Sequence, residues 1–102
     1  MSTKTNNYSD AKRTDHGVDV AAHVLLTARV RYVTSKVKHQ RLDYFKLVTQ
    51  LNLAGNDADA ERVARLTEQV SAAYETLNQT RDALGKLQGL LNEVSERLES
   101  SQ

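Results

Sequence analysis

The fold is decided by residues 63–98, which read VARLTEQVSAAYETLNQTRDALGKLQGLLNEVSERL. One set of apolar residues recurs here every seven positions, and a second set falls between its members at steps of three and four. Such a heptad pattern is typical of a long helix whose narrow apolar seam packs against another helix. The two sets are Val63, Val70, Leu77, Leu84, Leu91 and Leu98, and Leu66, Ala73, Thr80, Leu87 and Val94.

A similar seam precedes this stretch in residues 17–54, where the spacing again alternates between three and four, as a helix requires. Only Gln40 interrupts it. A competing pattern exists over residues 24–32, where apolar residues alternate with polar ones as in a β-strand. Helical spacing continues through residues 38–51, so we expect a helix. The seam residues are Leu26, Val30, Val33, Val37, Tyr44, Leu47, Leu51 and Ala54.

The break between the two seams is predicted at residues 55–57. Gly55 can adopt the left-handed conformation that commonly ends a helix. Asn56, Asp57 or Asp59 can then cap the following helix through a side-chain oxygen. The sequence therefore predicts a first helix over about 17–54, a turn at 55–57 and a second helix over about 58–99.

Folding the chain back at Asn56 brings apolar residues against apolar residues along nearly the whole length, which favours a hairpin over one continuous rod. The same seam contacts would also form between chains, in a domain-swapped four-helix bundle. Both arrangements remain open from the sequence. The expected facing pairs include Leu51 with Val63, Tyr44 with Val70, Val37 with Leu77, and Leu26 with Leu87.

Residues 1–16 are polar and have no apolar period, which predicts an extended N-terminal arm. The predicted fold class is all-α: this arm, followed over 17–102 by an antiparallel two-helix coiled-coil hairpin that assembles into a larger helical bundle. The chain contains no proline, the strongest helix breaker, and only 39% hydrophobic residues, so a large globular interior is not expected.

No constellation of residues suggests catalysis, and we expect no enzyme activity, no cofactor and no metal. Cysteine is absent, which excludes thiolate ligands and nucleophiles. Asp19 and His23 stand four residues apart, but a zinc site needs three or four ligands. The acidic residues Glu61, Glu68, Glu75 and Asp82 recur every seven positions, on the side of the helix opposite the seam. They are therefore expected to lie on a solvated face.

Charge is distributed unevenly along the chain. Residues 1–54 contain nine Lys or Arg and four Asp or Glu, a net charge of +5, whereas residues 55–102 contain five and nine, a net charge of −4. One interpretation is complementary faces of two antiparallel helices. The alternative is contact between the basic segment and nucleic-acid phosphates, which need only a positive face. The candidate contacts are Arg29, Arg31, Lys36, Lys38 and Arg41.

Apolar residues outside both seams predict a surface for a protein partner. The candidates are Leu42, Phe45, Tyr74 and Leu90. The expected function is structural: an assembly protein that associates with itself or docks on other subunits, as in a virion or another macromolecular complex. The alternatives are a dimeric nucleic-acid-binding regulator and a small helical inhibitor or adaptor of a host protein. No apolar run has the length of a membrane span, and the expected location is the cytoplasm, or the virion of a phage.

Overall fold

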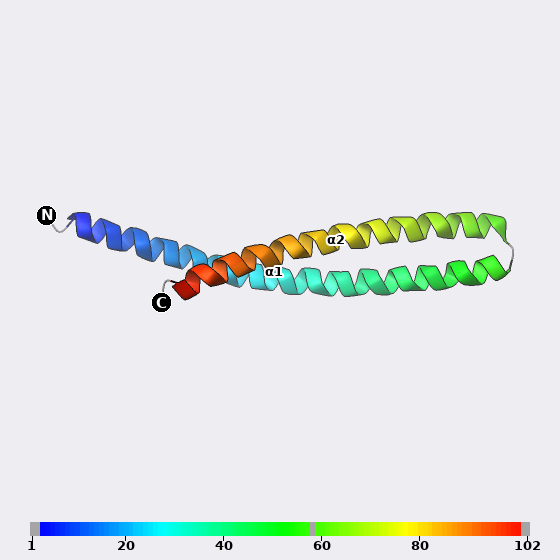
Figure 1. The fold of residues 1–102 in the computed structure, drawn as a ribbon, viewed down its shortest axis with the longest axis horizontal. Coiled ribbons are helices and arrows are strands. Elements are labelled where there is room, and N and C mark those ends of the chain that lie inside the picture. Colours follow the sequence, from blue (N-terminus) through cyan, green and yellow to red (C-terminus); the bar gives the residue numbers. More distant parts are fainter. Residues whose placement is uncertain (1–2, 58, 101–102) are drawn as a thin grey trace. The chain divides into compact units, whose positions relative to one another are not determined.

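Two long helices make up the fold. A computed structural model describes residues 3–57 and 59–100, with side chains described from residue 15 onward. Helix α1 covers Thr3–Asn56 and helix α2 covers Ala60–Ser100 (Figure 1). No strand occurs in these ranges, so the alternative of a strand over residues 24–32 is wrong. The seam explains the outcome, because Leu26, Val30 and Val33 stand at steps of four and three and so lie on one side only when the backbone is helical.

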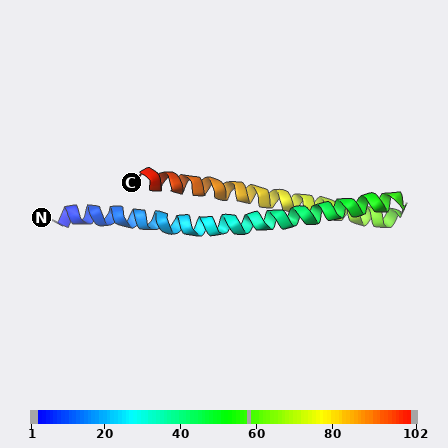
Figure 2. The ribbon, with the colours of Figure 1, turned by 90° about the horizontal axis from the view of Figure 1, so that it is seen from below.

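The chain divides into two compact units, each containing a piece of α1 and a piece of α2. One unit, Tyr32–Leu84, holds the turn and the two helix segments that extend from it side by side, with opposite chain directions (Figures 1 and 2). The other unit combines Met1–Arg31 with Gly85–Gln102. The two helices pack against each other as an antiparallel hairpin, which confirms the predicted all-α coiled-coil fold.

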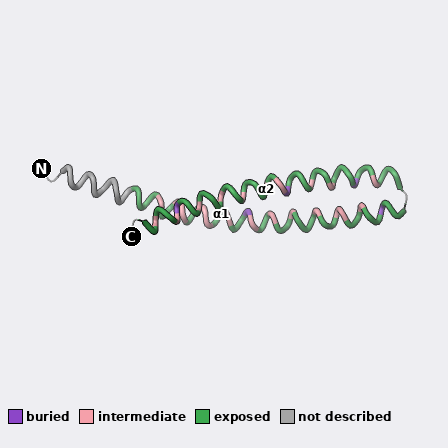
Figure 3. Tube along the Cα trace, in the orientation of Figure 1, coloured by how far each residue is buried: buried purple, intermediate pink, exposed green. Residues whose placement is uncertain are grey.

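Burial follows the heptads. Among the residues whose side chains are described, five apolar ones are buried, namely Val33, Ala54, Leu66, Leu77 and Val94, and all five belong to the predicted seams. Every other seam residue named above is partly buried, whereas most of the remaining surface of both helices is exposed (Figure 3). Full burial of one such Leu or Val side chain contributes about 1.5–3 kcal/mol. The repeated seam is therefore what holds the two helices together.

The turn lies two residues later than predicted. Gly55 is helical, within α1, and does not adopt a left-handed conformation. The backbone N–H of Asp57 donates to the carbonyl oxygens of Leu53 and Ala54, both at 3.2 Å, and closes the last turn of α1. Asp59 then caps α2, because its Oδ1 accepts a 3.1 Å hydrogen bond from the backbone N–H of Arg62. This cap fixes the start of α2, so the break between the helices falls after Asn56 and before Ala60.

The predicted extended arm over residues 1–16 is also wrong where the structure describes it, because α1 begins at Thr3. Composition alone favoured an arm, since these residues have no apolar period. Extending an existing helix, however, fixes only one residue for each new hydrogen bond, whereas starting a helix is costly. No proline stands between residues 3 and 17 to stop that extension. The helix nucleated in the packed segment therefore continues toward the N-terminus.

Two side-chain contacts join the helices across the hairpin. Tyr44 contacts Tyr74, with ring centroids 5.8 Å apart, and Asp19 contacts Arg97 at 3.3 Å. The Tyr44 contact lies one helical turn further along α2 than Val70, the predicted partner of Tyr44.

Candidate interaction surface

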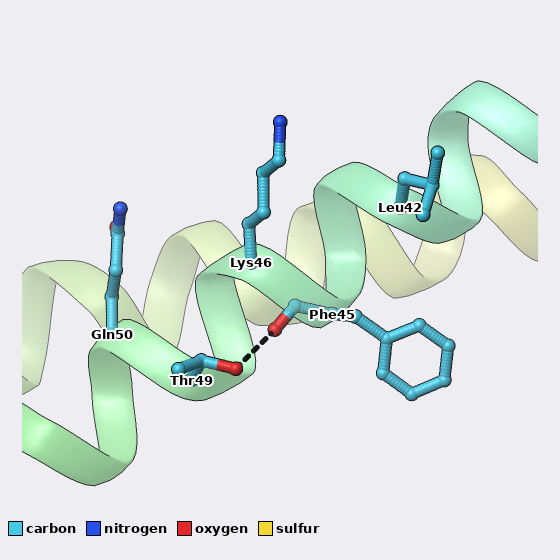
Figure 4. Close-up of a pocket in the computed structure, with 5 residues that line it drawn as sticks. All are labelled: Leu42, Phe45, Lys46, Thr49 and Gln50. Carbon is cyan, nitrogen blue, oxygen red and sulfur yellow. Dashed lines mark hydrogen bonds between the residues drawn. The ribbon is translucent and has the colours of Figure 1, made fainter.

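A group of side chains on α1 lines an open hollow on the surface of the unit Tyr32–Leu84 (Figure 4). The hollow has a volume of about 380 Å³ and is lined by Leu42, Phe45, Lys46, Thr49 and Gln50. These residues are neighbours because side chains three and four positions apart share one side of a helix. We call them, together with Leu53, the outer patch.

The apolar members of the outer patch are well exposed to solvent. Leu42 has 60% of its surface exposed, and Phe45 and Leu53 each have 56%. None of them belongs to the seam that α2 covers. The hydroxyl of Thr49 donates a 2.9 Å hydrogen bond to the carbonyl oxygen of Phe45, one turn back on the same helix (Figure 4). That hydroxyl is thus partly satisfied within α1, which makes the patch less polar than its composition suggests.

A row of aromatic rings leads from the outer patch onto α2. The ring centroids of Phe45 and Tyr44 are 5.8 Å apart, and those of Tyr44 and Tyr74 are also 5.8 Å apart. Tyr44 is partly buried in the seam, whereas Tyr74 is 52% exposed. Tilted rings at such distances attract one another beyond the effect of burial. The outer patch is therefore continuous, through Tyr44, with an exposed aromatic side chain of the second helix.

Positive charge surrounds the outer patch. Four cationic side chains of α1 in this unit are exposed, and one acidic residue, Asp43, lies among them. The α1 segment of residues 32–56 therefore carries a net charge of +3 with histidine neutral. An anionic partner would be attracted to this side of the unit. The four cations are Lys36, Lys38, Arg41 and Lys46.

The side of α2 opposite its seam carries negative charge. Glu61, Glu68, Glu75 and Asp82 recur there every seven residues and are all exposed, as predicted for a solvated face. Between them on the same side lie only small or polar residues. No pair of these carboxylates sits in an enclosed cavity in the described residues, which general acid–base chemistry would require to separate two pKa values.

The second unit has its own exposed apolar residues and one ion pair. Val24 is 62% exposed and Leu25 70% exposed on α1. Arg97 Nε donates to both carboxylate oxygens of Asp19, at 3.3 and 3.4 Å. Arg97 is 55% exposed and Asp19 21% exposed, so solvent screening limits the pair to at most about 1 kcal/mol. This pairing gives Asp19 a structural partner in place of the metal site considered with His23.

The structure brings together only part of the predicted partner surface. Leu42 and Phe45 line one hollow, and Tyr74 joins them through Tyr44. Leu90, which is 49% exposed, belongs to the other unit. The sequence-based selection omitted Lys46, Thr49 and Gln50 from this surface. The signal that would have found them is helical spacing, because Lys46 and Thr49 stand four residues after Leu42 and Phe45, and Gln50 four residues after Lys46.

The predicted nucleic-acid contacts are all exposed on α1. Arg29 and Arg31 lie in the unit that contains the chain ends, whereas Lys36, Lys38 and Arg41 lie in the unit that contains the turn. The described residues include no group of three or more His, Asp or Glu side chains arranged to hold a metal ion.

Neither helix, as far as it is described, has a stretch both long and apolar enough to cross a lipid bilayer. Comparisons with known protein families, curated proteins and solved structures find no match to this chain.

Proposed function

We propose that the protein is a non-enzymatic structural or assembly component, such as a virion or macromolecular-complex subunit, that docks on other subunits or on copies of itself through its helices. The observation that supports this function is the outer patch. The seam already joins α1 to α2, so the exposed Leu42, Phe45 and Leu53 serve no purpose in holding the hairpin together. Contiguous exposed apolar surface of this kind usually marks a site of protein association.

The native mass of the purified chain tests self-assembly. Sedimentation equilibrium over a range of concentrations should show a helical oligomer whose dissociation follows mass action. A stable, fully helical monomer at all concentrations would contradict self-assembly. Docking on other subunits would then be the remaining form of the proposed function. A poorly helical monomer would instead favour the inhibitor or adaptor function, since such a chain would fold only against its host protein.

A second candidate function is nucleic-acid binding, which the exposure of all five predicted cations supports. Each neutralised phosphate releases counterions, so binding to DNA of random sequence should weaken steeply as salt is raised. A fluorescence-anisotropy titration at several salt concentrations measures this slope. No binding at low salt would dismiss this candidate. Substituting Lys36 and Lys38 by Gln should lower the slope, whereas substituting Lys86 of α2 should not change it.

A further inference from the structure

We propose that the outer patch of α1 docks an amphipathic helix of another protein, and that this helix presents an apolar row bordered by Asp and Glu. This inference rests on the proposed function, because it names the kind of subunit that docks. It follows from three features of one surface: the spacing of the apolar side chains, the sign of the charges around them, and the mismatch between this surface and both the outer patch and the outer α2 side of a second copy.

The apolar spacing fits a helix as the partner. Leu42, Phe45 and Leu53 stand along one side of α1, and the open hollow between Leu42 and Gln50 lies among them. Residues 42–53 span roughly 16 Å at 1.5 Å per residue, which is the length of three helical turns. A partner helix anchored by apolar residues at positions i, i+3 or i+4, i+7 and i+11 covers the same distance.

The charges specify what borders that apolar row. Lys38 and Arg41 lie within one turn of Leu42, and Lys46 lines the hollow itself. Only Asp43 opposes them in this segment. Carboxylates on both edges of the incoming helix would meet these cations, which accelerates encounter and rejects partners with basic edges.

A second copy of this chain does not offer that combination. Its own outer patch would supply the apolar row, but would place Lys38, Arg41 and Lys46 of the two copies near one another. Like charges brought together in this way oppose association. The outer side of its α2 supplies carboxylates at Glu68, Glu75 and other heptad positions, but no large apolar side chain stands between them. The occupant is therefore a protein of different sequence.

The binding experiment uses the full chain and two designed helical peptides of about four heptads. Both peptides have the same apolar row, which is bordered by Glu in one and by Lys in the other. Isothermal titration calorimetry should detect binding of the Glu-bordered peptide and at least about tenfold weaker binding of the Lys-bordered one. Raising NaCl from about 50 to about 500 mM should weaken the favoured complex several-fold.

Paired variants locate the site. The double substitution L42S and F45S should reduce affinity for the Glu-bordered peptide by about tenfold or more, because it removes two central anchors. Leu90→Ser is the matched control on α2 and should leave affinity unchanged. Both native side chains in the patch are more than half exposed, so the variant should keep the circular-dichroism melting curve of the parent.

The charge variant K38E and K46E should invert the preference, so that the Lys-bordered peptide binds more tightly. Lys86→Glu, an exposed position of α2, is the control and should not alter the preference. Equal binding of both peptides to the parent, or unchanged binding by L42S and F45S, overturns the inference.

Two further outcomes separate this inference from the proposed function. If L42S and F45S dissociate a native oligomer, then a second copy occupies the patch, and the inference fails while self-assembly stands. If vesicles containing phosphatidylserine bind the parent through the same residues and neither peptide does, then the patch is a lipid-binding surface and both proposals fail.

Discussion

Replacing Gln40 by leucine should stabilise the hairpin. Gln40 interrupts the apolar seam of α1 and is partly buried. Its Oε1 atom is buried and has no hydrogen-bond partner in the described part of the chain. Thr80, another polar residue of the seam, is different, because its hydroxyl donates a 3.0 Å hydrogen bond to the carbonyl oxygen of Thr76. Gln40 is therefore the weakest layer of the seam.

Two effects of Gln40→Leu both raise the free energy of unfolding. A buried acceptor without a partner costs about 1–3 kcal/mol, and Gln40→Leu removes it. The leucine side chain also buries apolar surface in the seam, at roughly 25 cal/mol per Å². Because the Gln40 side chain as a whole is only partly buried, we expect the lower part of this range, about 1–2 kcal/mol. For a chain of this size that corresponds to a rise in Tm of roughly 5–15 °C.

Urea unfolding followed by far-ultraviolet circular dichroism measures the change, with protein concentration held constant since any oligomer makes stability depend on it. Gln79→Leu is the matched control, because Gln79 is exposed on α2, and it should change stability by no more than about 0.5 kcal/mol. An unchanged or lower free energy of unfolding for Gln40→Leu would refute the reasoning and show that the Oε1 atom is satisfied. Sedimentation of the same variant shows whether Gln40 also restricts the number of chains, as single polar seam residues do in coiled coils.

Three other substitutions test the packing, the turn and the helix backbone by urea unfolding. Leu77→Ala should cost about 2–5 kcal/mol because the side chain is buried, whereas Leu90→Ala, at a half-exposed position, should cost under about 1 kcal/mol; equal losses would contradict the assigned seam. Asp59→Ala should cost about 1 kcal/mol through loss of the α2 cap, and Asp57→Ala should show no such loss if the cap is assigned correctly. Gly89→Ala should stabilise by about 0.5–1 kcal/mol, since the residue is helical and an added Cβ meets no atom within 4 Å; destabilisation would mean that another backbone approaches there.

The seam was predictable from sequence because it depends only on period. Within each helix the seam residues recur at steps that only a helical backbone places on one side. The structure buries several of them, namely Val33 on α1 and Leu66, Leu77 and Val94 on α2. The start of α1 was not predictable in this way. Composition reports whether a segment has apolar surface to bury, but residues 3–16 are helical as the extension of a helix nucleated elsewhere. A polar segment without proline, adjacent to a strong seam, is better read as part of that helix.

The outer patch was only partly predictable for a related reason. Leu42 and Phe45 were selected because they are apolar and lie outside the seam, but the hollow also involves Lys46, Thr49 and Gln50. These polar residues carry no sequence signal of their own. Their contribution becomes visible once α1 is known to be helical at that point, since positions three and four apart then line one surface.

The position of the turn decides which residues of α1 and α2 lie next to each other. Because glycine often ends a helix, the sequence predicts that α1 ends next to Gly55. A turn at that point pairs Tyr44 with Val70. The structure instead uses Asp59 as the α2 cap, and a glycine within α1 costs only about 1 kcal/mol relative to alanine. Moving the turn by two residues changes which α2 residues lie near Tyr44, and its ring contacts that of Tyr74 at 5.8 Å between centroids. A prediction of the contacts between two helices therefore depends on the position of the cap as well as on the heptad period.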